Sequence, residues 1–234
     1  MRSLVIVVTL NMLLAAAALP SNAQEAERPL RLGATFGVSS ASIQGPGAPD
    51  QAGSRAALKG GVEVYVLFQS SPFAMVSGLS MVGKGAQMDD GVADYEVSLT
   101  YLQLPAMAEV TFGSPVTFYS RMGPYLSLLQ QARRKGTVFL GTNEFTGEQT
   151  TESVDKSITD GLQSLNAGIR GGFGIRFPFF NGKLGARVMV ERSLSEITKP
   201  SATTVFSRAQ ARAGNQYNRA VTISLHYSLP IADL

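Results

Sequence analysis

Residues 97–132 alternate apolar side chains with polar or small ones, as strands that bury a single face do. From residue 116 onward the apolar residues fall on even positions. The odd positions hold Thr117, Tyr119, Arg121, Gly123 and Ser127. A repeat of two residues predicts a strand with one apolar and one polar face. Gly-Ser-Pro at 113–115 divides the stretch, so we predict a hairpin of two long strands.

The first strand of this hairpin changes its pattern near Tyr101. Residues 102–112 place their apolar side chains on even positions, whereas Val97 and Leu99 are apolar on odd ones. We therefore expect a β-bulge or a register break at Tyr101. Pro105 has no backbone N–H, so it is expected to interrupt one ladder of the sheet.

Eight segments of the chain carry a strand pattern. They are 30–40, 58–69, 73–84, 97–112, 116–132, 164–177, 183–191 and 220–229. The connections between them alternate strictly: three are short, and the long ones are 41–57, 85–96, 133–163 and 192–219. This alternation predicts an all-β protein: an eight-stranded antiparallel up-and-down transmembrane β-barrel with short periplasmic turns and long extracellular loops. We expect residues 24–234 to form this single domain.

Alternation alone leaves open which face points inward, and the composition of the polar faces favours a membrane barrel. They carry glycine with single arginines and glutamates, which suits a narrow eight-stranded interior better than a surface in water. Aromatic residues flank the short turns, where an interfacial girdle belongs. These are Phe68, Phe73, Phe112, Phe118, Phe177, Phe179, Phe180 and Tyr227. The alternatives are a soluble periplasmic lipocalin-like barrel with an apolar ligand inside, and a soluble sandwich.

The first residues predict export from the cytoplasm. Arg2 precedes an apolar run at 4–19, and small residues follow at 21–23, so residues 1–23 are expected to form a signal peptide cleaved after Ala23. The chain has no cysteine and a single histidine, which argues against disulfides, thiolate chemistry and a histidine metal cluster. A net charge of +3 gives no reason to expect a nucleic-acid partner. We predict no enzymatic activity, cofactor or metal.

Two short motifs give the chain a specific resemblance. Tyr-Leu-Gln-Leu-Pro at 101–105 and Gly-Pro-Tyr-Leu at 123–126, together with 168–177 and 184–197, resemble the PorT-like outer-membrane β-barrel family. The resemblance implies an eight-stranded barrel in the outer membrane of a diderm bacterium. Because some members of that family serve protein secretion or gliding, it also implies an accessory role in a secretion or envelope system.

Charged residues on the polar faces form the main candidate site. The predicted lumen cluster consists of Arg31, Glu63, Glu109, Arg121, Arg170, Arg176, Arg187 and Glu191. Glu109 and Arg121 lie almost symmetrically about the turn, so they are expected to face each other. The cluster is either the charged constriction of a narrow channel or relay, or a salt-bridged plug. We favour the plug, because eight strands enclose little more than their own side chains.

Other candidates carry weaker signals. His226 falls near the periplasmic end of the last strand, where a lumen-packing role is favoured over that of a catalytic base. The basic residues 133–135 are expected at the outer rim. Residues 137–146 are expected to extend the hairpin above the membrane. Predicted partners are outer-membrane lipid and other envelope proteins, which would bind through loops 133–163 and 192–219.

Overall fold

The computed structural model describes residues 30–45, 52–68, 71–89, 93–142, 149–197 and 216–231. The expected leader, residues 1–23, lies outside this part of the chain. The described residues form a short 3-10 helix, η1 (Thr159–Gly161), and nine strands. The strands are β1 (Leu30–Gln44), β2 (Ala52–Leu67), β3 (Phe73–Asp89), β4 (Ala93–Phe112), β5 (Thr117–Thr142), β6 (Gln149–Ser157), β7 (Leu165–Phe179), β8 (Gly182–Ser193) and β9 (Tyr217–Pro230). No helix within these ranges is long and apolar enough to cross a membrane.

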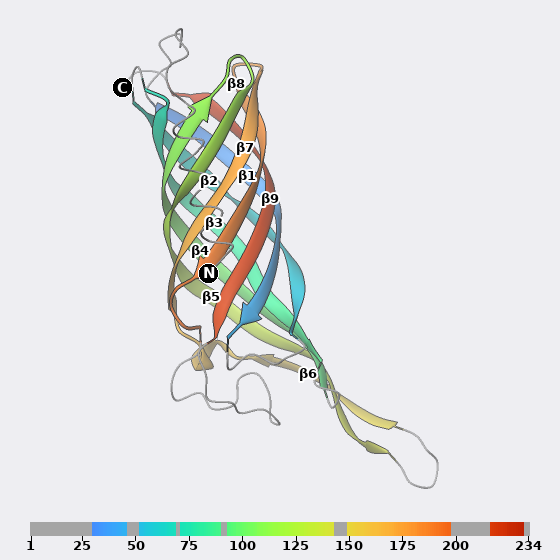
Figure 1. Ribbon diagram of the computed structural model, residues 1–234. Coiled ribbons are helices and arrows are strands. Elements are labelled where there is room, and N and C mark those ends of the chain that lie inside the picture. The colour runs from blue at the N-terminus through green and yellow to red at the C-terminus, as the bar shows by residue number, and fades with distance from the viewer. Residues whose placement is uncertain are drawn as a thin grey trace.

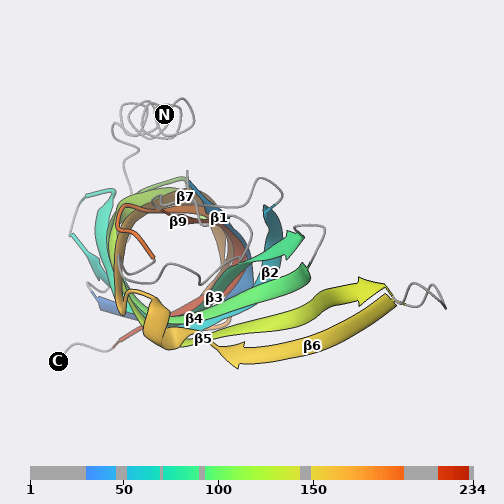
Figure 2. The ribbon, with the colours of Figure 1, turned by 90° about the horizontal axis from the view of Figure 1, so that it is seen from below.

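Eight of these strands close into a ring. The antiparallel order is β4-β3-β2-β1-β9-β8-β7-β5, and pairing between β4 and β5 completes the circle (Figures 1 and 2). Strands that are consecutive in the ring are also consecutive in the chain, except where β9 returns to β1 and where β6 intervenes between β5 and β7. The predicted eight-stranded up-and-down barrel is confirmed.

Strand β6 lies outside the ring, and among the described residues it pairs with β5 alone. The C-terminal part of β5 pairs with β6 from Arg133↔Ser157 to Thr142↔Gln149, whereas its N-terminal part pairs with β7. The β5–β6 hairpin therefore projects beyond the barrel wall (Figure 1). The expected extension of the hairpin is found as far as Thr142. Residues 143–146 lie outside the described residues.

The strands run further toward the long-connection end than the sequence pattern indicates. The expectation of a loop at 85–96 is wrong, because this segment pairs in register from Gly85↔Ser98 to Asp89↔Asp94. The loop expected at 41–57 is likewise shortened, since β1 runs to Gln44 and β2 begins at Ala52. The start of β4 does alternate, with Tyr95 buried between the exposed Asp94 and Glu96, but its apolar positions are out of phase with those of residues 102–112.

The two faces of the sheet lie as the composition of the polar faces predicts. On β9 the side chains of Ile223 and Leu225 are 64% and 61% exposed, whereas Thr222 between Val221 and Ile223 is fully buried. The phenylalanines near the short turns are exposed, apart from the half-buried Phe112, and Phe180 at the β7–β8 turn is the most exposed. Apolar side chains outside and polar ones inside are the reverse of a lipocalin-like barrel, so that alternative is wrong.

The register break opposite Tyr101 is present, but the extra residue lies on β5. Thr100 pairs with Gln131 and Tyr101 with Leu129, which leaves Gln130 without a partner across the strand pair. Strand β4 keeps its phase, and the apolar residues Val97 and Leu99 therefore point into the barrel.

Pro105 breaks the pairing of β4 with β3. Paired residues jump from Ser77↔Ala106 to Ser80↔Gln103 around the proline. The Ser77 hydroxyl donates a hydrogen bond of 2.8 Å to the Pro105 carbonyl at this gap. A side chain thus supplies one of the contacts that the ladder lacks there.

Candidate functional site

All eight residues of the predicted lumen cluster lie inside the barrel. Their relative exposure does not exceed the 9% of Arg31, which lies at the short-turn end beside Tyr65 and Pro230. The other seven belong to two ion-pair networks at successive levels of the interior. In both networks, side chains from strands that are not neighbours in the ring meet across the lumen.

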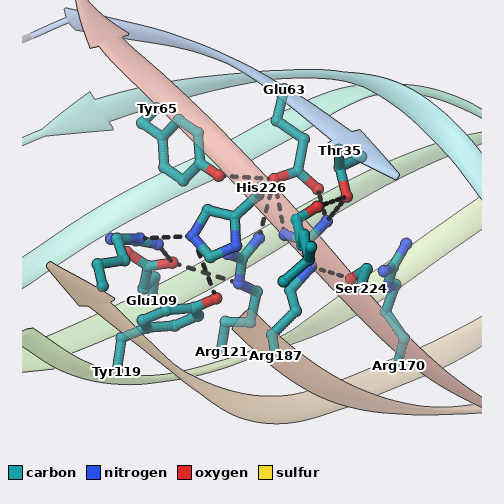
Figure 3. Close-up of polar contacts among 12 residues, drawn as sticks. Thr35, Glu63, Tyr65, Glu109, Tyr119, Arg121, Arg170, Arg187, Ser224 and His226 are labelled. Atoms are coloured by element: carbon teal, nitrogen blue, oxygen red, sulfur yellow. Dashed lines mark hydrogen bonds and ion pairs between the residues drawn. The ribbon is translucent and has the colours of Figure 1, made fainter. Parts of the chain in front are cut away.

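The first network is centred on Glu63 of β2 (Figure 3). Arg187 of β8 donates to both carboxylate oxygens, through Nη1 to Oε2 and through Nη2 to Oε1, each at 2.7 Å. Arg187 also donates to Thr35 Oγ1 at 2.7 Å and to Ser224 Oγ at 2.9 Å. The Tyr65 hydroxyl donates to Glu63 Oε2 at 2.7 Å. All three guanidinium nitrogens of Arg187 thus donate hydrogen bonds, and both oxygens of Glu63 accept them.

Glu109 of β4 extends this network toward the short turns. As predicted, Glu109 and Arg121 are cross-strand partners, and Arg121 Nε lies 3.2 Å from Glu109 Oε2. Arg176 Nη2 donates to the same oxygen at 2.5 Å. Arg121 Nη1 also donates to Glu63 Oε2 at 3.3 Å, so one arginine joins the two carboxylates.

Aromatic rings and His226 complete this level of the interior. The Arg176 guanidinium carbon lies 3.9 Å from the ring centre of Tyr119 and 5.0 Å from that of Tyr65, which are cation–π distances. Arg176 Nε donates to His226 Nε2 at 3.1 Å. Because this nitrogen accepts a hydrogen bond, the ring carries its proton on Nδ1. His226 lies near the short-turn end of β9 and is packed edge-on against Tyr119.

The second network surrounds Glu191, which lies four residues after Arg187 on β8. Its carboxylate lies 3.2 Å from Lys59 Nζ, 3.0 Å from Lys84 Nζ and 3.7 Å from Arg170 Nη2. Gln103 donates to Glu191 Oε2 at 3.1 Å and accepts from Arg170 Nη1 at 3.0 Å. One carboxylate is therefore shared by three cations.

Lys59 and Lys84 were not identified from the sequence. Lys59 keeps the inward phase of Glu63 on β2, so the alternation contained its signal. Lys84 lies on β3, where both faces are largely apolar or small and the pattern does not separate inside from outside. With them, the buried cations of the described residues outnumber the buried carboxylates. The cations are Arg31, Lys59, Lys84, Arg121, Arg170, Arg176 and Arg187, and the carboxylates are Glu63, Glu109 and Glu191.

An apolar layer lies beyond the second network, at the long-connection end. It gathers inward side chains of the barrel around Leu162, which follows η1, and Ile197, which follows β8. The barrel residues of this layer are Ile43, Ala86, Tyr95, Val97, Leu99, Tyr101, Leu129 and Ala132. Gln163 N donates to Ile197 O at 2.9 Å, which ties the two connecting segments together over the interior. This layer gave no clear signal in the sequence, because Val97 and Leu99 are out of phase with the apolar residues of 102–112 and indicate a register break instead.

The polar interior is held together by ion pairs. No group of three or more His, Asp or Glu side chains within the described ranges is placed to hold a metal ion. The carboxylates are occupied by cations, and His226 is held by Arg176. Each of the three buried carboxylates is thus paired with at least two cations, and the described interior keeps an excess of positive charge.

Comparison with known proteins places the chain in a family. Residues 22–199 match the family described as "Outer membrane protein beta-barrel domain", and the chain belongs to it. The protein is therefore an eight-stranded β-barrel of the bacterial outer membrane. No curated protein matches the sequence significantly.

Solved structures with a similar fold are distant in sequence. The Neisserial surface protein A (NspA) is 14% identical, with 88% of this chain and 100% of that chain covered and a TM-score of 0.45. OprG from Pseudomonas aeruginosa is 12% identical, with 88% and 99% covered and a TM-score of 0.43. Ail of Yersinia pestis is 10% identical, with 88% and 100% covered and a TM-score of 0.40.

Proposed function

We propose that this protein is a closed, non-enzymatic barrel that acts through the parts it exposes outside the membrane. The observation that carries the proposal is the filled interior: two ion-pair networks are followed by an apolar layer along the same axis. An eight-stranded barrel has room for little besides its own side chains. Such an interior is expected to stabilise the folded barrel and not to let solutes pass through it.

The β5–β6 hairpin is the segment best placed to meet a partner. It extends past the wall on one side, and β6 pairs through one edge only, within the described residues. An unpaired strand edge offers backbone groups to an added strand, and the exposed side chains from Thr151 to Ser157 are polar or charged, apart from the half-buried Val154. Together with the resemblance to PorT-like proteins, this supports an accessory role in a secretion or envelope system.

A narrow channel is the second candidate, and the excess of buried cations is the observation that favours it. A pore lined by arginine and lysine would select anions. The plug and the channel differ in conductance. The purified barrel in planar bilayers is expected to leave the baseline unchanged, whereas a channel would give discrete anion-selective steps.

The partner role is tested by photo-crosslinking in intact cells. A photoreactive residue at Ser153 on β6 is expected to give a discrete protein adduct. The same residue at the lipid-facing Leu225 is the matched control and is expected to give none. Absence of an adduct at Ser153, or conductance steps from the purified barrel, would overturn the proposal.

A further inference from the structure

Two arginines face each other on the outside of the barrel. Arg192 of β8 and Arg219 of β9 are direct cross-strand partners, and both side chains are exposed. The next outward pair toward the short turns is Val190↔Val221, which belongs to the apolar face. The arginine pair therefore lies immediately beyond the apolar band, at its long-connection edge.

The described part of the chain supplies no counter-charge for this pair. Like charges directly opposite each other destabilise a sheet. No carboxylate of the described residues forms an ion pair with either guanidinium. Across the flanking ladders Arg192 faces Ile169 and Arg219 faces Ser42, which are both uncharged.

The sequence between the two arginines adds to the excess of positive charge. Residues 193–218 contain one acidic residue, Glu196, against three basic ones, Lys199, Arg208 and Arg212. The pair and the segment that joins it are thus strongly cationic. An anion from outside the chain would relieve the repulsion.

The surroundings indicate what kind of anion this is. Val221, on the short-turn side of the pair, is 39% exposed. Leu194, two residues after Arg192, is 62% exposed. Apolar surface beside a cationic pair matches a lipid, whose acyl chains lie against the barrel while its headgroup lies at the band edge. Arginine binds phosphate through two parallel hydrogen bonds, and its apolar stem can extend along the lipid face.

We propose that Arg192 and Arg219 together bind the phosphate of an anionic lipid headgroup in the leaflet at the long-connection end. Other outward cations at this rim differ. Arg133 faces Ser98 and Ser157, and Lys135 faces Glu96 and Asp155. Arg133 is therefore the matched control: a single exposed arginine on the same rim with no like charge opposite.

The test is native mass spectrometry of the full chain released from detergent with phosphatidic acid or phosphatidylcholine. The wild-type barrel is expected to retain one phosphatidic acid in preference to phosphatidylcholine. The double variant R192Q/R219Q is expected to bind phosphatidic acid at least about tenfold more weakly, the loss expected from one or two charge-assisted hydrogen bonds. R133Q is expected to bind as the wild type does.

Retained heat-dependent gel mobility shows that each variant is folded, and inorganic phosphate serves as a competitor. Equal binding by R192Q/R219Q and the wild type would overturn the proposal, as would equal retention of the two lipids by the wild type. Displacement of the lipid by millimolar phosphate would assign the site to free phosphate and overturn the lipid assignment.

Discussion

Arg187 on β8 and Glu63 on β2 form a bidentate ion pair across the barrel interior, with both nitrogen–oxygen distances at 2.7 Å. The two residues are 124 positions apart in the chain. Between their strands in the ring lie β1 and β9, which supply Thr35 and Ser224 as further acceptors for Arg187. One guanidinium therefore links four strands.

A double-mutant cycle tests this pair. Arg187→Met and Glu63→Gln are each expected to lower the free energy of unfolding by about 3–5 kcal/mol. The first leaves Glu63 with only its longer ion pair to Arg121, and the second leaves Arg187 without a carboxylate. The double variant should lose less than the sum, with a coupling of about 2 kcal/mol. Urea unfolding in lipid vesicles measures all three values.

The exposed Arg133 is the control for that cycle. Arg133→Met is expected to change the free energy of unfolding by no more than about 0.5 kcal/mol. Strict additivity of the Arg187 and Glu63 substitutions would mean that the two side chains do not interact in the folded barrel.

His226 is expected to act by accepting a hydrogen bond. Replacement by phenylalanine leaves Arg176 Nε unpaired inside the barrel and should lower the free energy of unfolding by about 1–3 kcal/mol. His226→Gln keeps a side-chain acceptor and should lose less. Equal losses for the two variants, measured by the same unfolding assay, would contradict the assigned hydrogen bond.

Much of the fold was predictable because lipid and lumen select different side chains. Ile223 and Thr222 are neighbours on β9 and fall on opposite faces, as their alternation predicts. The cross-strand pairing of Glu109 with Arg121 was also predictable, because a tight turn fixes the register of its hairpin.

Other features could not be found in this way. Val97 and Leu99 are apolar yet point inward, because the interior changes from charged to apolar toward the long-connection end. Alternation distinguishes two faces but does not reveal such a change along the axis. Lys84 was missed for a related reason: its strand presents small or apolar residues on both faces.

Glycine at position 37 allows β1 and β9 to approach closely. A Cβ atom there would lie 2.6 Å from the Cα of Ser224. Gly37→Val is therefore expected to destabilise the barrel by about 3 kcal/mol and to reduce the fast-migrating folded band of an unheated gel. Gly53→Val is the matched control, since its Cβ would meet nothing closer than 3.5 Å. Equal folding of the two variants would show that β1 and β9 are not so closely apposed.

The hairpin beyond the wall is expected to be dispensable for folding. Residues Gly136 and Val154 are cross-strand partners, so a two-residue turn can replace the segment between them. Because β6 is not part of the closed ring, the deletion removes only the last two pairs between β4 and β5, Asp94↔Thr137 and Ala93↔Val138. The shortened barrel should therefore unfold within about 0.5 kcal/mol of the wild type. Loss of the folded gel band in this variant would place β6 in the stable core.

Throughout the barrel, one stripe of each strand lines a closed interior while the outward apolar stripe contacts lipid. The chain has no cysteine, so single thiols introduced at Thr222 and Ile223 can be compared directly in outer-membrane vesicles. A lipid-soluble maleimide should modify the thiol at 223, and a water-soluble maleimide should modify neither until the barrel is unfolded. Rapid modification at 222 by the water-soluble reagent in the folded protein would contradict a closed interior lined by this stripe.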